Sequence, residues 1–244
     1  MKPVENLDKT VYANECYLTS ENKLVHVKYD QYPESPRSFT DGNIGKFFLL
    51  DRGSKLNETE FEDWNAILKY FGVEWTGNLE KDIALLKKAA VKKDEMILPV
   101  TKYDHSGVNI FVGLPGEWDY SFLGVIMLDK KALKDLGCEH LTREEIEKEL
   151  KQEVNTYSEW YDGNVYEVVL YDILKDEDGD LSLDEVERVG TLYGYQNLKE
   201  LKADFIPGDI TDYLGDYEDA DNALYNNLKA IRAKLNAGNE PQIS

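Results

Sequence analysis

The pattern of apolar and polar positions predicts a chain built mainly from antiparallel strands. Residues 11–30 alternate between apolar and polar side chains around the turn-forming Ser20-Glu21-Asn22, which predicts a β-hairpin. The longest strand-forming stretch is Ile97–Leu128, which is divided by glycines. Further strands are predicted over these ranges: 47–50, 95–103, 107–113, 121–128 and 165–171.

Apolar residues at intervals of three and four predict helices between and after these strands. The predicted helices cover about 58–71, 79–93, 142–160 and 219–236. The pairs Asn57 with Glu60 and Thr142 with Glu145 have the spacing of a capping box, which marks a helix start. We therefore expect an α+β fold, mostly antiparallel sheet with packed helices.

A change in composition divides the predicted fold. Residues 172–221 contain sixteen acidic and four basic residues, which accounts for twelve of the twenty net negative charges. We expect an α+β core over 1–174, with a helical insertion at about 57–93. Residues 175–244 are expected to form an acidic C-terminal extension that is mostly helical.

The charge of the whole chain excludes several kinds of partner. A formal net charge of −20 repels nucleic acid and anionic membranes, and it attracts basic surfaces such as those with which proteins hold DNA or RNA. Acidity that serves solubility alone is the alternative. The sequence shows no signal peptide and no membrane span, which favours the cytoplasm.

The strongest candidate for catalysis is the segment Tyr103–Gly107, followed by Asp119. A histidine beside carboxylates can act as a general base, so Asp104, His105 and Asp119 are candidate catalytic residues of a hydrolase or nuclease, with Ser106 as a possible nucleophile. The same residue types also form stable turns, and the structural interpretation is favoured.

An acidic loop at 176–185 is partly similar to an EF-hand calcium loop. Its candidate ligands are Asp176, Asp178, Asp180 and Glu185. Leu174 occupies the first ligand position and the preceding residues predict a strand, so a turn followed by a short helix that begins near Ser182 is favoured over a calcium site. No cofactor is expected, and the phosphate-binding and nucleophile-elbow motifs are missing from the sequence.

Acidic and aromatic residues alternate over 204–219, which predicts a surface that binds a partner. Ordered carboxylates there would compete with nucleic acid for the Lys and Arg side chains of a partner, and an ordinary solvated acidic face is the alternative. The candidate partner-binding residues are Asp204, Asp209, Asp212, Tyr213, Asp216, Tyr217, Glu218 and Asp219.

Several short motifs resemble those of a family of small proteins carried by bacterial phages and plasmids. The resemblance covers roughly 30–175 and rests on these segments: Pro33-Glu34-Ser35-Pro36-Arg37, Leu98–Gly107, Trp118-Asp119 with Gly124-Val125-Ile126, and Gly163–Val169. The family continues after its arginine to a histidine that this chain lacks, which weakens a catalytic scheme based on that histidine. The resemblance implies cargo of a mobile element, where small acidic proteins often block host defence nucleases.

These observations together predict a counter-defence inhibitor without enzymatic activity, of the anti-CRISPR or antirestriction type. Its acidic C-terminal part would occupy the basic nucleic-acid channel of a host nuclease complex. The alternatives are a hydrolase or nuclease that acts through the histidine segment and, more weakly, a calcium-binding module.

Overall fold

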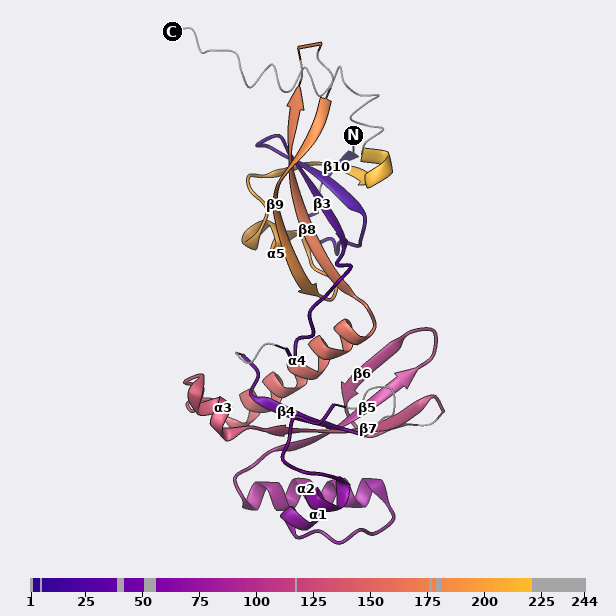
Figure 1. Cartoon of the computed structure of the whole chain (residues 1–244), viewed down its shortest axis with the longest axis vertical. Helices are drawn as coiled ribbons and strands as arrows, with labels where there is room; N and C mark the ends of the chain where they lie inside the picture. Colours follow the sequence, from indigo (N-terminus) through magenta and orange to yellow (C-terminus); the bar gives the residue numbers. More distant parts are fainter. Residues whose placement is uncertain are drawn as a thin grey trace. The chain divides into compact units, whose positions relative to one another are not determined.

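A computed structural model describes residues 2–4, 6–38, 42–50, 56–116, 118–175, 177–178 and 181–220 (Figure 1). The chain forms two compact units. Unit 1 combines residues 1–33 with 164–244, and unit 2 comprises residues 34–163. The boundary expected between residues 174 and 175 falls instead inside one hairpin of unit 1, because the strands on either side of it pair with each other.

Unit 2 contains a four-stranded antiparallel sheet in the order β4-β7-β5-β6, with helices on both faces (Figure 1). Its strands are β4 (Gly45–Leu49), β5 (Ile97–Asp104), β6 (Val108–Val112) and β7 (Tyr120–Leu128). Its helices are α1 (Trp64–Phe71), α2 (Leu79–Lys92), α3 (Lys130–Asp135) and α4 (Arg143–Tyr161). The expected strands and the helices at 79–93 and 142–160 are confirmed within two or three residues.

Two hydrophobic layers hold this sheet between its helices. On β4, Phe47 packs in the layer formed with α4, whereas its neighbour Phe48 packs in the layer formed with α1 and α2. Successive side chains of a strand point to opposite faces, so a continuous apolar run is needed where both faces are covered. The apolar runs in β4, β5 and β7 meet this requirement.

One glycine of β7 allows two strands to approach closely. Gly124 lies opposite Leu49 with a φ of +152°, and a Cβ atom there would lie 2.0 Å from the carbonyl oxygen of Phe48. Only glycine fits this position, since any side chain would collide with the backbone of β4.

Arg37 joins four segments of unit 2 through a buried cluster of ion pairs. Its guanidinium, with 6% of the side chain exposed, donates to both carboxylate oxygens of Glu58 at 2.7 and 2.9 Å and to Glu153 on α4 at 2.8 Å. It also donates to the Asn43 side chain and to the Gly45 carbonyl. The Glu153 carboxylate in turn accepts from the backbone N–H groups at 44 and 45. Burial opposes the charge on Arg37, but the two carboxylates outweigh it and raise its pKa.

The expected start of helix α1 is wrong because Asn57 and Glu58 are engaged elsewhere. The Asn57 side chain accepts from the backbone of Thr59 and donates to the carbonyl of Phe61, which forms a turn. Glu58 is bound to Arg37 and to the backbone of β4. The helix begins six residues later than predicted, capped by Asp63, and its end at Gly72 is confirmed.

Unit 1 contains a six-stranded sheet in the order β1-β10-β2-β3-β8-β9. Its strands are β1 (Lys2–Pro3), β2 (Glu15–Thr19), β3 (Lys23–Tyr29), β8 (Val165–Lys175), β9 (Leu181–Tyr193) and β10 (Ile210–Asp216). Helix α5 (Leu198–Asp204) packs through Leu198 and Leu201 on one face of this sheet. The predicted hairpin at 11–30 is confirmed as β2 and β3.

The acidic C-terminal part contains more strand than expected. The short helix predicted after the acidic loop is wrong, because residues 181–193 form β9 and pair along nearly the whole of β8. Residues 210–216, which carry several of the predicted partner-binding residues, are strand β10. Of the helix predicted over 219–236, all but the first two residues lie outside the described residues.

Replacing Arg37 should destabilise unit 2 strongly. Arg37→Met leaves two carboxylates without their buried cation, so we expect a loss of about 3–5 kcal/mol in the free energy of unfolding. All four tryptophans lie in unit 2, so urea unfolding followed by tryptophan fluorescence reports this unit. The matched variant Arg143→Met, at an exposed position, should lose less than about 1 kcal/mol. Equal losses in the two variants would contradict the role given to Arg37.

Candidate functional site

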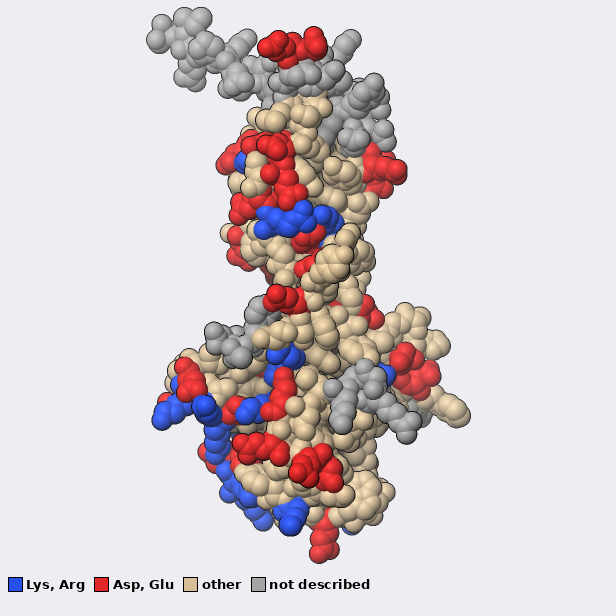
Figure 2. All heavy atoms as spheres, in the orientation of Figure 1, with Lys and Arg blue, Asp and Glu red and all other residues tan. Residues whose placement is uncertain are grey.

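The β8–β9 hairpin carries acidic side chains, in its connecting loop and on the edge strand β9, that have no basic partner among the described residues. Glu177, Asp178, Asp184 and Glu187 are exposed, and none is within ion-pairing distance of a Lys or Arg among the side chains that the structure describes. Unit 1 has twenty-three acidic and eleven basic residues. Acidic side chains predominate on its visible face in Figure 2, where a band of basic side chains crosses them. We call Glu177, Asp178, Asp184 and Glu187 the hairpin acids.

Two of the carboxylates on the β8–β9 hairpin oppose each other. Asp184 of β9 is the direct cross-strand neighbour of Asp172 on β8. Like charges at such a position destabilise a sheet. The charge of Asp172 is balanced by Lys23 of β3, at 2.6 Å, which leaves Asp184 with an unbalanced charge at the sheet edge.

The other face of the same strands is electrically balanced. Arg188 of β9 donates to Glu167 at 2.9 Å and to Glu185 at 2.8 Å, and Lys28 lies 3.0 Å from Glu167. The two carboxylates raise the pKa of Arg188. Unbalanced acidity therefore distinguishes the hairpin acids from the paired carboxylates behind them.

The segment predicted to bind a partner does not form one continuous acidic row. Asp204 ends α5, and Asp209 is paired with Lys202. Asp212 is only 8% exposed, so its carboxylate is not available at the surface. Tyr213 packs on Tyr17 and beneath the Lys9 ammonium.

The last residues of that segment turn back onto the sheet. The Asp216 carboxylate accepts from the backbone N–H of Asp219, and Glu218 between them is exposed. Tyr217 stacks on His26 of β3, with ring centroids 4.6 Å apart. The structure thus uses the aromatic members of the segment for packing.

His26 is buried as a neutral imidazole. Its Nε2–H donates to Asn14 at 3.2 Å, whereas Nδ1 is buried without a hydrogen-bond partner. Burial is the main cause that lowers its pKa to about 4, and Lys28 adds to the effect.

The segment with Asp104, His105 and Ser106 forms the turn between β5 and β6. The imidazole Nδ1 of His105 lies 3.4 Å from Asp119, and both side chains are about half exposed or more. The carboxylate of Asp104 lies instead 3.4 Å from Lys102, and the Ser106 hydroxyl donates to the His105 carbonyl at 2.6 Å. The structure brings together one of the predicted pairs, His105 with Asp119, and does not direct the serine hydroxyl to the imidazole.

The calcium-like loop connects two strands. Asp176 and Asp180 lie outside the described residues, Asp178 is exposed, and Glu185 is bound to Arg188. Where the structure describes the chain, no group of three or more His, Cys, Asp and Glu side chains is arranged to hold a metal ion.

Sequence reasoning missed Asp184 and Glu187, because residues 181–193 were expected to begin with a helix. The signal was present in the alternation of Leu181 and Leu183 with Ser182 and Asp184, which is the period of a half-buried strand. An alternation of only four residues is easily overlooked when acidic residues flank it in the sequence.

Comparisons with known proteins give no match: no family model, no curated protein and no solved structure corresponds to this chain. None of the helices in the described part is long and apolar enough to cross a membrane.

Acid should destabilise unit 1 through His26. The unfolded chain binds a proton at this side chain near pH 6.5, whereas the folded state does so only near pH 4, so stability falls as the pH drops from about 6.5 to 4. The full effect is about 3 kcal/mol. His26→Gln should remove this part of the pH dependence, measured by urea unfolding with circular dichroism. His140→Gln, at an exposed position, should keep the wild-type dependence. Parallel pH profiles for wild type and His26→Gln would contradict the assignment.

Proposed function

We propose that this chain is a non-enzymatic binding protein that blocks a basic nucleic-acid-binding surface of a partner. The observation that carries the proposal is the set of four hairpin acids, which are exposed and lack basic partners among the described side chains. All four lie on one hairpin, in its connecting loop and along its edge strand. A hairpin that carries such acids can enter a groove that normally holds a nucleic-acid strand.

Electrostatics favours this kind of partner. A groove lined by Lys and Arg attracts anionic surfaces, and an acidic protein surface can satisfy its charge in place of the phosphates of nucleic acid. The net charge of −20 speeds the encounter with a basic partner at low ionic strength. Binding driven in this way becomes weaker as salt is added. A fall in affinity with rising salt concentration therefore identifies this kind of binding.

An exposed edge strand also has unpaired backbone N–H and C=O groups to which another chain can bind. Charged side chains at a sheet edge prevent unwanted pairing with other chains, and this role alone would explain acidic residues on β9. It does not explain why Asp184 stands opposite Asp172, since a lysine at position 184 would protect the edge and also relieve the repulsion. The surplus carboxylate of Asp184 at this edge supports a binding role.

The resemblance of several motifs to proteins of phages and plasmids supports the choice of partner class. We propose a host defence nuclease complex, of the CRISPR or restriction type, as the target. The protein would then act in the cytoplasm of the host.

Neutralising the hairpin acids should abolish inhibition. We expect the variant with Glu177→Gln, Asp178→Asn, Asp184→Asn and Glu187→Gln to lose protection of incoming DNA. The measurement is the efficiency of plasmid transformation into cells with active CRISPR or restriction defence, with and without the protein. A matched variant carries Gln at the exposed positions Glu60, Glu62, Glu144 and Glu149 of unit 2, so that the net charge is equal.

Folding of the variant can be checked independently of function. Because Asp184→Asn removes the repulsion with Asp172, this substitution should leave the free energy of unfolding unchanged or raise it by up to about 1 kcal/mol. Full protection by the stable four-residue variant would refute the proposal. Equal loss in both four-residue variants would show that only total charge matters. Reversal of Asp212 is unsuitable as a test, because its burial would couple binding to stability.

The contact between His105 and Asp119 supports hydrolysis as a second candidate function. Asp119 can orient the imidazole as a general base for an attacking water. His105→Gln should then reduce cleavage of DNA, RNA or model esters on the order of a hundredfold or more. His140→Gln serves as the control. Cleavage that persists in His105→Gln, or that never exceeds the buffer background in wild type, would reject this function.

A further inference from the structure

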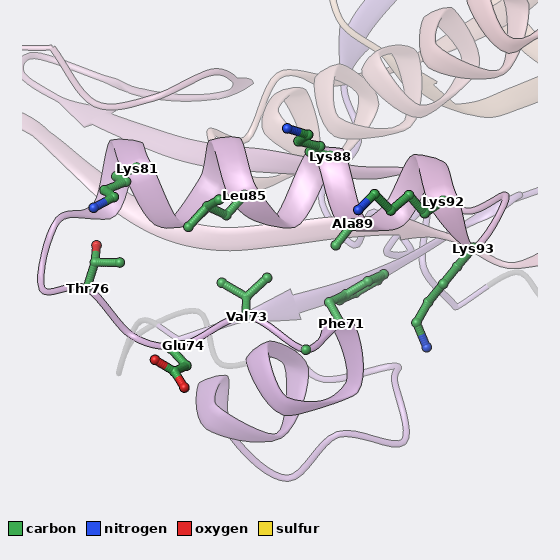
Figure 3. A pocket seen from close by; sticks show the side chains of 11 residues that line it. Phe71, Val73, Glu74, Thr76, Lys81, Leu85, Lys88, Ala89, Lys92 and Lys93 are labelled. Carbon is green, nitrogen blue, oxygen red and sulfur yellow. The ribbon is translucent and has the colours of Figure 1, made fainter.

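A groove of unit 2 lies between the end of α1, the loop over 72–76 and helix α2 (Figure 3). Its volume is about 530 Å³, within the usual range of ligand sites. The residues that line it and carry the argument are Phe71, Val73, Lys81, Leu85, Lys88 and Lys92. This groove is separate from the hairpin acids, which belong to unit 1.

The lysines at this groove have no carboxylate partner in the described part of the chain. Lys81, Lys88 and Lys92 are exposed, and within the described residues no Asp or Glu lies within ion-pairing distance of them. Some lysines elsewhere in this acidic chain are paired, as Lys46 with Asp129 at 2.8 Å. Lys93 at the same groove stands 4.0 Å above the ring of Tyr70.

Helix stabilisation explains only part of this arrangement. Lys92 is in the last turn of α2, where a cation interacts favourably with the helix dipole. Lys81 is in the first turn of the same helix, where a cation is unfavourable. A ligand that brings negative charge accounts for cations at both ends.

The spacing of these lysines fits an elongated ligand. Lys81 and Lys92 are separated by eleven residues of helix, or about 16 Å. Figure 3 shows Lys81 at one end of the groove and Lys92 and Lys93 at the other. One small anion cannot reach both ends, whereas about five residues of extended peptide span this distance.

The floor of the groove is apolar. Phe71 and Val73 face Leu85 and Ala89 of α2 across it. On the other side of the loop, an adjoining hollow of about 380 Å³ is lined in part by Trp75, whose side chain is 57% exposed. Exposed tryptophans of this kind often provide most of the energy at binding surfaces.

We propose that this groove binds an extended acidic peptide segment of a partner protein that carries an apolar anchor residue. The peptide's carboxylates accept from the groove lysines, and its anchor packs on Val73 and Leu85. A nucleic-acid strand fits less well, because it has no aliphatic side chain to pack on Val73 and Leu85. A second copy of the chain is disfavoured by its own charge of −20.

The test uses a labelled hexapeptide, Glu-Leu-Glu-Phe-Glu-Asp with blocked ends, and fluorescence anisotropy at two salt concentrations. We expect wild type to bind it. Neutralisation by Lys81→Gln, Lys88→Gln and Lys92→Gln together should weaken binding by about tenfold or more. The matched variant has Gln at Lys131, Lys134 and Lys148, which are exposed and do not line the groove, and it should bind as wild type does.

Other outcomes of the same experiment decide against the proposal. Equal binding by wild type and the groove variant would overturn it. Equal binding of oligoglutamate without apolar residues would show charge attraction without a built site. Tighter binding of a single-stranded oligonucleotide that displaces the peptide would make the groove a nucleic-acid site. The four-residue hairpin variant should bind the peptide normally, so this test stands apart from the test of the inhibitor function.

Discussion

The buried charge of Arg37 is the constraint on which unit 2 depends. A guanidinium with 6% of its side chain exposed must be paired, and its two partners come from distant parts of the chain. Glu58 lies in the segment before α1, and Glu153 lies on α4. Each carboxylate also binds backbone N–H groups at or next to β4, so the cluster fixes the edge strand, the helix and two connecting segments at once. Because removing any partner leaves a buried charge, these segments are expected to fold together.

This role gives a structural reason for the motifs on which the proposed resemblance to phage and plasmid proteins rests. The segment ending in Pro36-Arg37 is a loop that presents Arg37 to the cluster, and it is held by Asn43, which donates to the Pro36 carbonyl. The segment around His105 is a turn in which Ser106 has a φ of 57°. Gly163 has a φ of 80° at the boundary between the units. These motifs mark points of structural constraint, which is why their residue types look chemically suggestive in the sequence alone.

The distribution of charge between the two units is more informative than the net charge of the whole chain. Unit 2 has twenty-five acidic and seventeen basic residues, so it is less acidic than unit 1 and carries the lysine-lined groove. Among the described side chains of unit 1, most bases are paired with carboxylates, whereas the hairpin acids are exposed. A chain with a net charge of −20 can therefore offer two surfaces of opposite character, since screening by salt limits each field to about 8 Å.

The sequence by itself determined those features that depend on neighbouring residues. The hairpin of β2 and β3, the periodicity of α2 and α4, and the capping box of Thr142 with Glu145 are local, and all were predicted correctly. The α+β class followed from the same patterns. Only the tertiary structure decided where local preferences were overridden. Glu58 lies outside the helix predicted for it because its carboxylate pairs with the buried Arg37. Residues 181–193 form a strand because they pair with the edge of β8. The candidate sites changed for the same reason: pairing across the sheet decided which carboxylates are balanced, and helix packing placed lysines around a groove, neither of which is visible in the order of residues.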